Sequence, residues 1–356
     1  MWEKVYLKGT DFLESTHGKV GCVICHGGNS QAEEKELAHQ GVVADPSEES
    51  CTPCHRDVAE LHENSLHATL SGFKTKLEAR GANLSEGSAL TTALDNHCQQ
   101  CHTSCGQCHV SRPDEMGGGL VSGHVFRKTP SMQYNCTACH GARVGDEYLG
   151  NNEGVPADVH WQKAGMTCAK CHGQELHGTG AVVSHRYANA ASPKCEDCHQ
   201  DVWTETADNP QHRQHLGELD CYVCHAVAYK NCYDCHVGID DKGLPYFRSE
   251  PSEIGFKIGL NPIRSSQRPY KYVVLRHIPV CADTFDYYGS DLLPDFETVS
   301  TWKYATPHNI QLHTPQNESC DSCHGNKSLF LTGDDLDPAE REANRGVIVI
   351  QAPPSK

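Results

Sequence analysis

The sequence has few of the residues that normally fill a protein interior. Only 8 Phe, 4 Trp and 4 Met occur among 356 residues, and the mean hydropathy is −0.56. A chain of this length ordinarily buries one large apolar core or two modest ones. Something other than side chains is therefore expected to fill much of the interior.

Long apolar runs and basic clusters are also missing. No stretch approaches the roughly twenty apolar residues that a membrane-spanning helix needs, so the sequence predicts no transmembrane segment. The net charge is −16, and the one basic cluster, Arg264 to Lys271, is short. Nucleic acid is excluded as a partner, because contacts with phosphates need clustered Lys and Arg.

The residues present in excess are 21 cysteines and 24 histidines. Twenty of the cysteines form ten CxxC pairs, and a histidine directly follows every pair. The pairs are Cys22/Cys25, Cys51/Cys54, Cys98/Cys101, Cys105/Cys108, Cys136/Cys139, Cys168/Cys171, Cys195/Cys198, Cys221/Cys224, Cys232/Cys235 and Cys320/Cys323. The histidines that follow them are His26, His55, His102, His109, His140, His172, His199, His225, His236 and His324.

Three chemistries use closely spaced cysteines, and the histidines discriminate among them. A zinc site needs two CxxC pairs per ion and no histidine at the next position. A disulfide framework suits small secreted chains and leaves ten histidines unexplained. CxxCH is the attachment signature of c-type haem, in which two thioethers hold the porphyrin and the histidine binds the iron. The sequence therefore predicts ten covalent haem c groups, one per motif.

On these motifs the chain resembles the multihaem c-type cytochromes, with the haem number of a decahaem member. The resemblance covers residues 17 to 325 and lies in the CxxCH units and their histidines. It implies covalent haem, maturation outside the cytoplasm and electron transfer.

The sixth iron ligand is expected to be a second histidine, because the four methionines are too few to serve ten haems. Fourteen histidines lie outside the motifs. Ten of them are predicted ligands: His17, His67, His97, His124, His160, His177, His185, His212, His215 and His313. The other four are predicted not to be ligands: His39, His62, His277 and His308.

Some of these assignments are more specific. His212 and His215 are three residues apart, so they would share a helical face and serve the haems that begin at Cys221 and Cys232. His97 stands too close to Cys98 to fold back onto that haem, and we expect it to bind the iron of another one. His62 is expected at the surface, and His277 in a strand with its polar atoms satisfied.

The predicted fold is mostly irregular, with short helices wrapped around a chain of haems. Residues 1–243 form a multihaem region with nine motifs, residues 244–305 a haem-free β-rich insertion, and residues 306–356 the tenth motif with a short helix and a strand. Helices are predicted near 57–80 and 86–100, and after Asp337. Because seven residues separate Cys98 from Cys105, their haems must be close neighbours.

The β-rich insertion lies within the interval of 88 positions from Cys232 to Cys320. FKIGLNP, YKYVVLRHIPV and TFDYYG read as short strands, and VIVIQ near the end reads as another. The last of these needs a partner, either the internal β segment or a neighbouring subunit. Cys281, the one cysteine outside the motifs, is predicted to be a buried inert thiol.

Three functions fit the sequence, and electron transfer is favoured over enzymatic activity. The first is an extracellular electron conduit of closely packed bis-histidine haems, resembling cytochrome filament ("nanowire") subunits. In such filaments copies polymerise, and His17 or one of the unassigned histidines could ligate a haem of the next copy. The second is a periplasmic shuttle or porin-associated decahaem cytochrome. The third is a multihaem reductase for tetrathionate, nitrite or hydroxylamine with one open haem. The predicted partners are other redox proteins, copies of the chain itself, and an extracellular or periplasmic electron acceptor.

Overall fold

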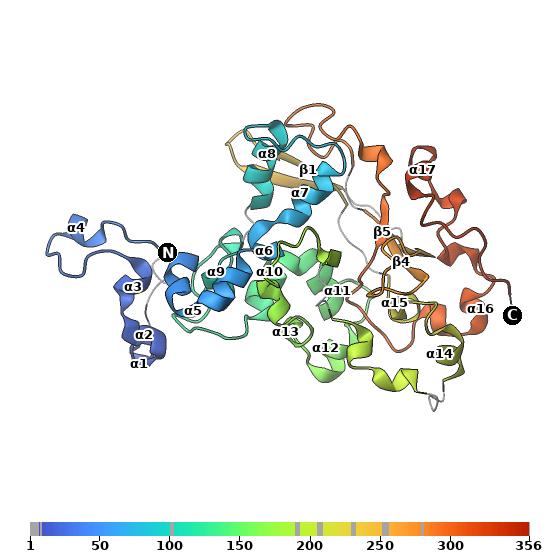
Figure 1. Cartoon of the computed structure of the whole chain (residues 1–356), viewed down its shortest axis with the longest axis horizontal. Coiled ribbons are helices and arrows are strands. Elements are labelled where there is room, and N and C mark those ends of the chain that lie inside the picture. The colour runs from blue at the N-terminus through green and yellow to red at the C-terminus, as the bar shows by residue number, and fades with distance from the viewer. Residues whose placement is uncertain are drawn as a thin grey trace. The chain divides into compact units, whose positions relative to one another are not determined.

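The structure is a computed structural model, and it describes residues 7, 9–99, 103–188, 193–204, 209–228, 233–250, 256–278 and 281–355. The predicted fold class is confirmed at the level of its elements: the chain is largely irregular, with short helices throughout and small antiparallel sheets in its C-terminal half (Figure 1). Within the described part of the chain, no helix is long and apolar enough to cross a membrane.

The chain divides into two compact units. Unit 1 comprises residues 1–73, 98–141 and 167–191, and unit 2 comprises residues 74–97, 142–166 and 192–356. Each unit is built from three separate stretches of sequence. The boundaries predicted at 243 and 305 both fall within unit 2.

Unit 1 holds five of the first six motifs on or beside short helices, and the third motif begins at Cys98 and lies partly outside the described residues. The helices are α1 (Asp11–Glu14), α2 (Thr16–Val20), α3 (Cys22–His26), α4 (Lys35–His39), α5 (Glu48–His62), α6 (Leu66–Thr69), α9 (Cys105–His109), α10 (Thr137–His140) and α13 (Cys168–Cys171). Helix α7 (Ser71–Glu78) runs from unit 1 into unit 2. The helix predicted over 57–80 is thus broken into α5, α6 and α7, because the Ser65 side chain caps a new helix by accepting from Ala68 N.

Unit 2 contains the remaining helices and all the described strands. The helices are α8 (Ala89–Ala93), α11 (Asp146–Leu149), α12 (Val159–Ala164), α14 (Pro210–His215), α15 (Cys221–His225), α16 (Cys320–Cys323) and α17 (Arg341–Asn344). The strands are β1 (Tyr233–Ile239), β2 (Pro245–Glu250), β3 (Phe256–Leu260), β4 (Tyr272–His277) and β5 (Trp302–Tyr304). The helix predicted over 86–100 is α8 followed by a π-helical turn, Leu94–Cys98.

The strands form two antiparallel sheets. Strands β1 and β2 make a hairpin with Val237 opposite Phe247, and β3, β4 and β5 pair in that order. The strands predicted from FKIGLNP and YKYVVLRHIPV are β3 and β4. The strand predicted from TFDYYG is wrong, because residues 282–288 form turns closed by local bonds such as Tyr288 N to Phe285 O.

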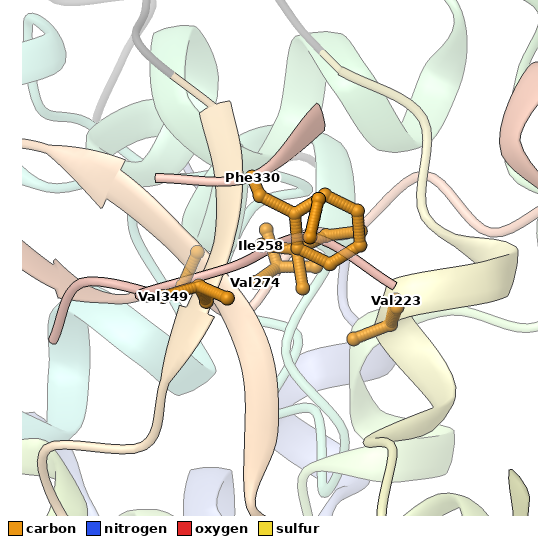
Figure 2. Packing of buried hydrophobic residues seen from close by; sticks show 7 residues of the cluster. Val223, Ile258, Val274, Phe330 and Val349 are labelled. Atoms are coloured by element: carbon orange, nitrogen blue, oxygen red, sulfur yellow. The ribbon is translucent and has the colours of Figure 1, made fainter. Parts of the chain in front are cut away.

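The apolar cores lie in unit 2. One cluster joins Val223 of α15, Ile258 of β3 and Val274 of β4 with Phe330 and Val349 (Figure 2). The VIVIQ segment is not a regular strand, but it pairs with the internal β segment: Leu260 N donates to Val347 O, and Val349 N donates to Leu331 O. A second cluster packs Leu90 and Ala93 of α8 against β1 and residues 285–296.

Unit 1 has almost no side-chain core. In its described residues, the only buried alanine, branched aliphatic or aromatic side chains are those of Ala59 and Val183. Large apolar residues stay exposed beside the motifs instead, including Ile24, which is 63% exposed inside the first CxxCH. The sequence predicted too few apolar side chains to fill the interior, and this shortage lies mainly in unit 1.

Candidate metal centres

Most motifs begin a helical turn at or beside their first cysteine. Helices α3, α9, α13, α15 and α16 all start there, and α5 carries the second motif in its middle. A polar residue before the cysteine often caps the turn: Ser104 accepts from Gln107 N, Asp220 from Tyr222 N and Ser319 from Ser322 N. Because residues i and i+3 share a helix face, the turn presents both sulfurs on one side.

Seven motif histidines face a second, non-motif histidine at nearly constant spacing. The two ring centroids lie 6.0 to 6.2 Å apart in each pair. The pairs are His55 with His17, His26 with His124, His140 with His67, His109 with His177, His199 with His160, His225 with His212, and His324 with His215. Every pair lies within one unit.

The Nδ1 atoms of many paired rings are held by oxygens. In the motif histidines, Nδ1 of His26 lies 2.8 Å from Val43 O, and Nδ1 of His225 lies 3.0 Å from Gln311 O. The same arrangement holds His109 against Arg127 O at 2.5 Å and His324 against Pro354 O at 3.1 Å. A carbonyl only accepts, so Nδ1 must carry the proton and Nε2 presents its lone pair.

Two of the facing histidines are oriented in the same way. Nδ1 of His215 lies 2.8 Å from Gln211 O, one turn earlier in α14. Nδ1 of His160 lies 3.0 Å from the carboxylate of Asp158, which is buried and also accepts from Ile310 N. Such second partners fix the ring and make it a better ligand. Asp158 was not singled out from the sequence, although its place two residues before a candidate ligand was the available signal.

Burial keeps several of these imidazoles neutral. Desolvation lowers the pKa of His67 to about 4, assisted by the nearby His140, and it also lowers the pKa of His17, His124 and His212. A neutral imidazole is the form that binds a metal.

The motifs of unit 1 touch one another in series. Ser50 Oγ donates to Cys25 O, which joins the first motif to the second. The thiols of Cys51 and Cys105 hydrogen-bond, and this bond raises the pKa of Cys51 and lowers that of Cys105. Asn135 Nδ2 donates to Gln107 O at 2.7 Å, which joins the fourth motif to the fifth.

The series continues with the sixth motif and recurs in unit 2. The thiols of Cys136 and Cys168 hydrogen-bond, which raises the pKa of Cys168, and those of Cys195 and Cys221 do the same, which raises the pKa of Cys221. Asn317 Nδ2 donates to Cys224 O at 3.1 Å just before the motif at Cys320. Named by their first cysteines, the motifs are therefore joined in two series. In unit 1 the series is Cys22, Cys51, Cys105, Cys136 and Cys168, and in unit 2 it is Cys195, Cys221 and Cys320. The nineteen described cysteines form no disulfide with one another.

The second cysteines of the motifs differ in exposure. Those that are exposed are Cys54, Cys139, Cys171 and Cys198. Burial of the second cysteine of the fourth motif, Cys108, raises the pKa of its thiol. Cys235 is half-buried and lies in strand β1 instead of a helical turn. The thioether bonds of all the motif cysteines stay a prediction.

Three predicted ligands are placed by contacts of another kind. His97 is buried in the π-helical turn, where its Nε2 lies 2.8 Å from Tyr288 Oη. His185 accepts at Nδ1 from Tyr187 N at 3.2 Å. His313 is exposed. We therefore do not assign His97 to a second haem.

The structure also changes the expectation for His215 and His62. His215 faces His324 of the tenth motif rather than the motif at Cys232, because α14 directs His212 and His215 toward different motif helices. The surface position predicted for His62 is wrong: the residue is 7% exposed, and its Nδ1 lies 2.7 Å from the Glu48 carboxylate.

The remaining predicted non-ligands behave in three ways. His277 ends β4 with Nε2 2.8 Å from the Glu340 carboxylate, so its predicted satisfied state is confirmed. His39 is exposed, with Nδ1 2.7 Å from Lys35 O. His308 is half-buried, and its Nδ1 lies 3.7 Å from Glu147. Cys101, His102 and Cys232, which are predicted haem-binding residues, lie outside the described residues.

The other two motif histidines have different surroundings. Nδ1 of His172 lies 3.4 Å from the Glu175 carboxylate. His236 sits in β1, not in a helix, and a ring nitrogen of it clusters with Cys281 and Asp283. Cys281 is half-buried, so it is less enclosed than predicted.

Comparisons with known proteins give no relative for this chain: no family model, curated protein or solved structure matches it. The interpretation of the site therefore depends on its own geometry.

Proposed function

We propose that the chain is a multihaem c-type cytochrome that carries one covalent haem on each CxxCH and conducts electrons between them. The observation that carries this proposal is the constant spacing of the seven histidine pairs. Two imidazoles on opposite sides of one metal ion, each with a metal–nitrogen bond of about 2.0 Å, would place their ring centroids roughly 6.3 Å apart. The observed 6.0 to 6.2 Å fits this value.

The residues around the pairs fit haem in three further respects. Each of the seven paired motif histidines follows two cysteines that form no disulfide and could make thioether bonds. Nδ1 donors leave Nε2 as the ligand atom. Exposed apolar residues such as Val23 and Ile24 line the motif, where a porphyrin face would cover them.

Haem iron supplies reversible one-electron chemistry when it is bound. The histidines on both sides of seven irons would fill the axial positions, which suits electron transfer and leaves no room there for substrate. The motif-to-motif contacts support conduction, because thioether-linked porphyrins at touching motifs have edges close enough for rapid tunnelling. Bis-histidine ligation also favours low potentials, because methionine is the ligand that raises them.

We include the extracellular conduit predicted from the sequence in this proposal, with other redox proteins or copies of the chain as partners. Covalent haem of this type matures outside the cytoplasm in the cytochromes that the motifs resemble. A periplasmic shuttle would use the same haem series.

The test uses the full chain produced in a host that matures c-type cytochromes. Intact mass and haemochrome absorbance should both give ten haems, and the ferric protein should be mainly low-spin. A haem count well below ten, or stoichiometric zinc in place of iron, would overturn the proposal. Turnover of nitrite or tetrathionate by a high-spin haem would favour the reductase instead.

A further inference from the structure

Three cationic side chains of unit 2 lie in one region without an acidic partner, in a chain whose net charge is −16. They are Arg80, which follows helix α7, Arg276 in strand β4 and Lys303 in strand β5. We call these three residues the cation cluster. None of the ion pairs formed by the described residues includes any of them. Acids outnumber bases in the chain by 46 to 30, so a group of cations without acids is unexpected.

Arg80 is the most enclosed member of the cluster, with 5% of its surface exposed. Its guanidinium carbon lies 5.2 Å from the centroid of the Phe296 ring, and its Nη1 donates to Lys76 O at 2.9 Å. Asp295 N donates to Arg80 O at 3.0 Å, so the backbone is held as well. The Nε atom of Arg80 is buried and has no hydrogen-bond partner among the described residues. Burying a charge with an unused donor costs free energy unless an anion compensates it.

The sheet brings the other two cations face to face. In the antiparallel pairing of β4 with β5, Arg276 lies directly opposite Lys303. Side chains at such positions share one face of the sheet, with Cβ atoms about 5 Å apart, and like charges there repel. Burial and the charge of Arg80 lower the pKa of the Lys303 ammonium to about 8. Lys303 therefore has one arginine opposite it in the sheet and a second within electrostatic range.

The acidic residue that interacts with the cluster is Glu147, which feels the charge of Arg276. Its carboxyl is 2% exposed, and burial raises its pKa to about 8, so most of it is protonated at pH 7. A neutral carboxyl does not balance a cation. At neutral pH the cluster therefore keeps its positive charge, and the described residues supply no carboxylate paired with it.

We propose that the cation cluster is a binding site for an oxyanion, with Arg80 and Lys303 contacting the ligand and Arg276 adding positive charge. A guanidinium presents paired N–H donors that match two oxygens of a carboxylate or a phosphate. The ligand is therefore a carboxylate or phosphate group. It has two sources: a propionate of a haem that the chain binds, or a free oxyanion from solution. Only the first source rests on the proposed function.

The surroundings of the cluster fit both sources. Phe296, beside Arg80, belongs to the second apolar cluster together with Val237, the residue that directly follows the histidine of the ninth motif. Lys303 is half-buried, so its ammonium is also within reach of a small anion from solvent. The experiment therefore needs one measurement for each source.

The first measurement is the thermal unfolding midpoint (Tm) of the holoprotein in phosphate and in chloride of equal ionic strength. If the ligand is a free oxyanion, phosphate should raise the Tm with concentration, because a ligand that binds only the folded state stabilises it. Arg80→Gln and Lys303→Met should each raise the Kd for phosphate about tenfold or more. Arg345→Ala removes an exposed arginine that already has an acidic neighbour, so this control should respond to phosphate as the wild type does.

The second measurement is a redox titration of the same proteins. If the ligand is a haem propionate, phosphate should act equally on all of them, and the midpoint potential of one haem should shift downward in Arg80→Gln and in Lys303→Met. The reason is that loss of a positive charge beside a haem favours the ferric over the ferrous state. The other haems and the Arg345→Ala control should keep their potentials.

The inference is overturned if Arg80→Gln and Lys303→Met match the control in both their phosphate response and their haem potentials. In that case the cluster holds no anion, and Lys303→Met should raise the Tm in every buffer because it relieves repulsion. If Arg80→Gln does not fold, Lys303→Met decides the matter alone, since Lys303 is only half-buried. The haem count is measured separately, so failure of this site leaves the proposed function intact.

Discussion

At the scale of single residues, the Nδ1 partners of the histidines decide what each ring can do. A backbone carbonyl holds Nδ1 of His26, His109, His225 and His324, and of His215 on the facing side. These bonds are made within the protein, so the ring is already in the correct tautomer and orientation before a metal arrives. Folding therefore orients the ligand, and metal binding does not have to.

The pairing predicts the effect of removing one facing histidine. His215→Ala removes the ring opposite His324, so one of the ten proposed haems should change from low-spin to high-spin. No haem should be lost, because the proposed thioethers to Cys320 and Cys323 would remain. His212→Ala should do the same for the haem at His225, and the double variant should convert two. Paramagnetic resonance of the ferric protein counts the converted haems.

The matched control for this pair is His39→Ala, which removes an exposed histidine whose Nδ1 bonds its own helix. It should leave the spectra unchanged. Conversion by His39→Ala, or no conversion by His215→Ala, would contradict the assignment.

At the scale of elements, residue types were more predictable from the sequence than partners were. Seven of the ten motif histidines and seven of the ten chosen distal histidines are the rings that the structure brings into pairs. Apart from that of His212, which faces His225 of a motif that it was expected to serve, their pairing was not visible, because a histidine that precedes one motif can face the histidine of another. His124 precedes the fifth motif by twelve residues yet faces His26, 98 positions away.

Helices and strands were also only partly predictable from the sequence. Alternating and apolar runs located β3 and β4, because their side chains pack on each other in unit 2. The aromatic run at 284–288 has strand-like composition, but Phe285 points into the core from a turn and Tyr288 bonds His97. Composition there reports burial and not backbone conformation.

Helix α17 supports a prediction about the stability of unit 2. Asn344 is fully buried at its end, accepts from Ser300 Oγ and Trp302 N, and donates to Thr301 Oγ1 and Glu340 O. Asn344→Leu would remove these four hydrogen bonds of a fully buried amide, so we expect a loss of about 2–4 kcal/mol in the free energy of unfolding. Denaturant unfolding monitored by tryptophan fluorescence measures it.

The adjacent residue provides the control. Arg345 is exposed and forms an ion pair with the exposed Glu342. Arg345→Ala should change the unfolding free energy by less than about 0.5 kcal/mol. Equal effects from both substitutions would show that the amide network contributes nothing specific.

At the scale of the whole molecule, stability should depend on pH through Glu147. This carboxyl is 2% exposed, and burial raises its pKa to about 8 from an ordinary value of 4.5. The folded state therefore holds a proton that the unfolded state releases above pH 4.5. The contribution of Glu147 to the free energy of unfolding is complete below pH 4.5 and is lost as the pH rises to about 8. Between these pH values the free energy of unfolding should fall by up to about 1.4 kcal/mol per pH unit.

Glu147→Gln isolates this contribution, because the amide mimics the protonated acid and does not titrate. The unfolding free energies of the two proteins should diverge between pH 5 and 8, with the wild type falling relative to the variant. Parallel pH profiles would contradict a raised pKa. Histidines with lowered pKa values act in the opposite direction, and they cancel in the comparison because both proteins carry them.

The arrangement of His17 bears on how copies of the chain would join. The sequence suggested that this near-terminal histidine could ligate a haem in the next copy of a filament. Its ring lies 6.1 Å from His55 of its own chain and stacks on Phe126 at 4.0 Å. We therefore expect His17 to serve the haem of His55 in its own chain.

This assignment can be tested in dilute solution, where copies do not meet. His17→Ala should turn one haem high-spin in protein that sedimentation shows to be monomeric, because the iron above His55 loses its own second ligand. Negative-stain microscopy of concentrated wild type and variant then asks separately whether fibres form, and a fibre-forming wild type should keep this property in the variant. If wild type and variant differed in spin state only in concentrated, fibre-forming samples, and not as monomers, His17 would serve a neighbouring copy. The stacking on Phe126 makes that outcome unfavourable, since reaching another chain would expose the stacked faces of the two rings to water.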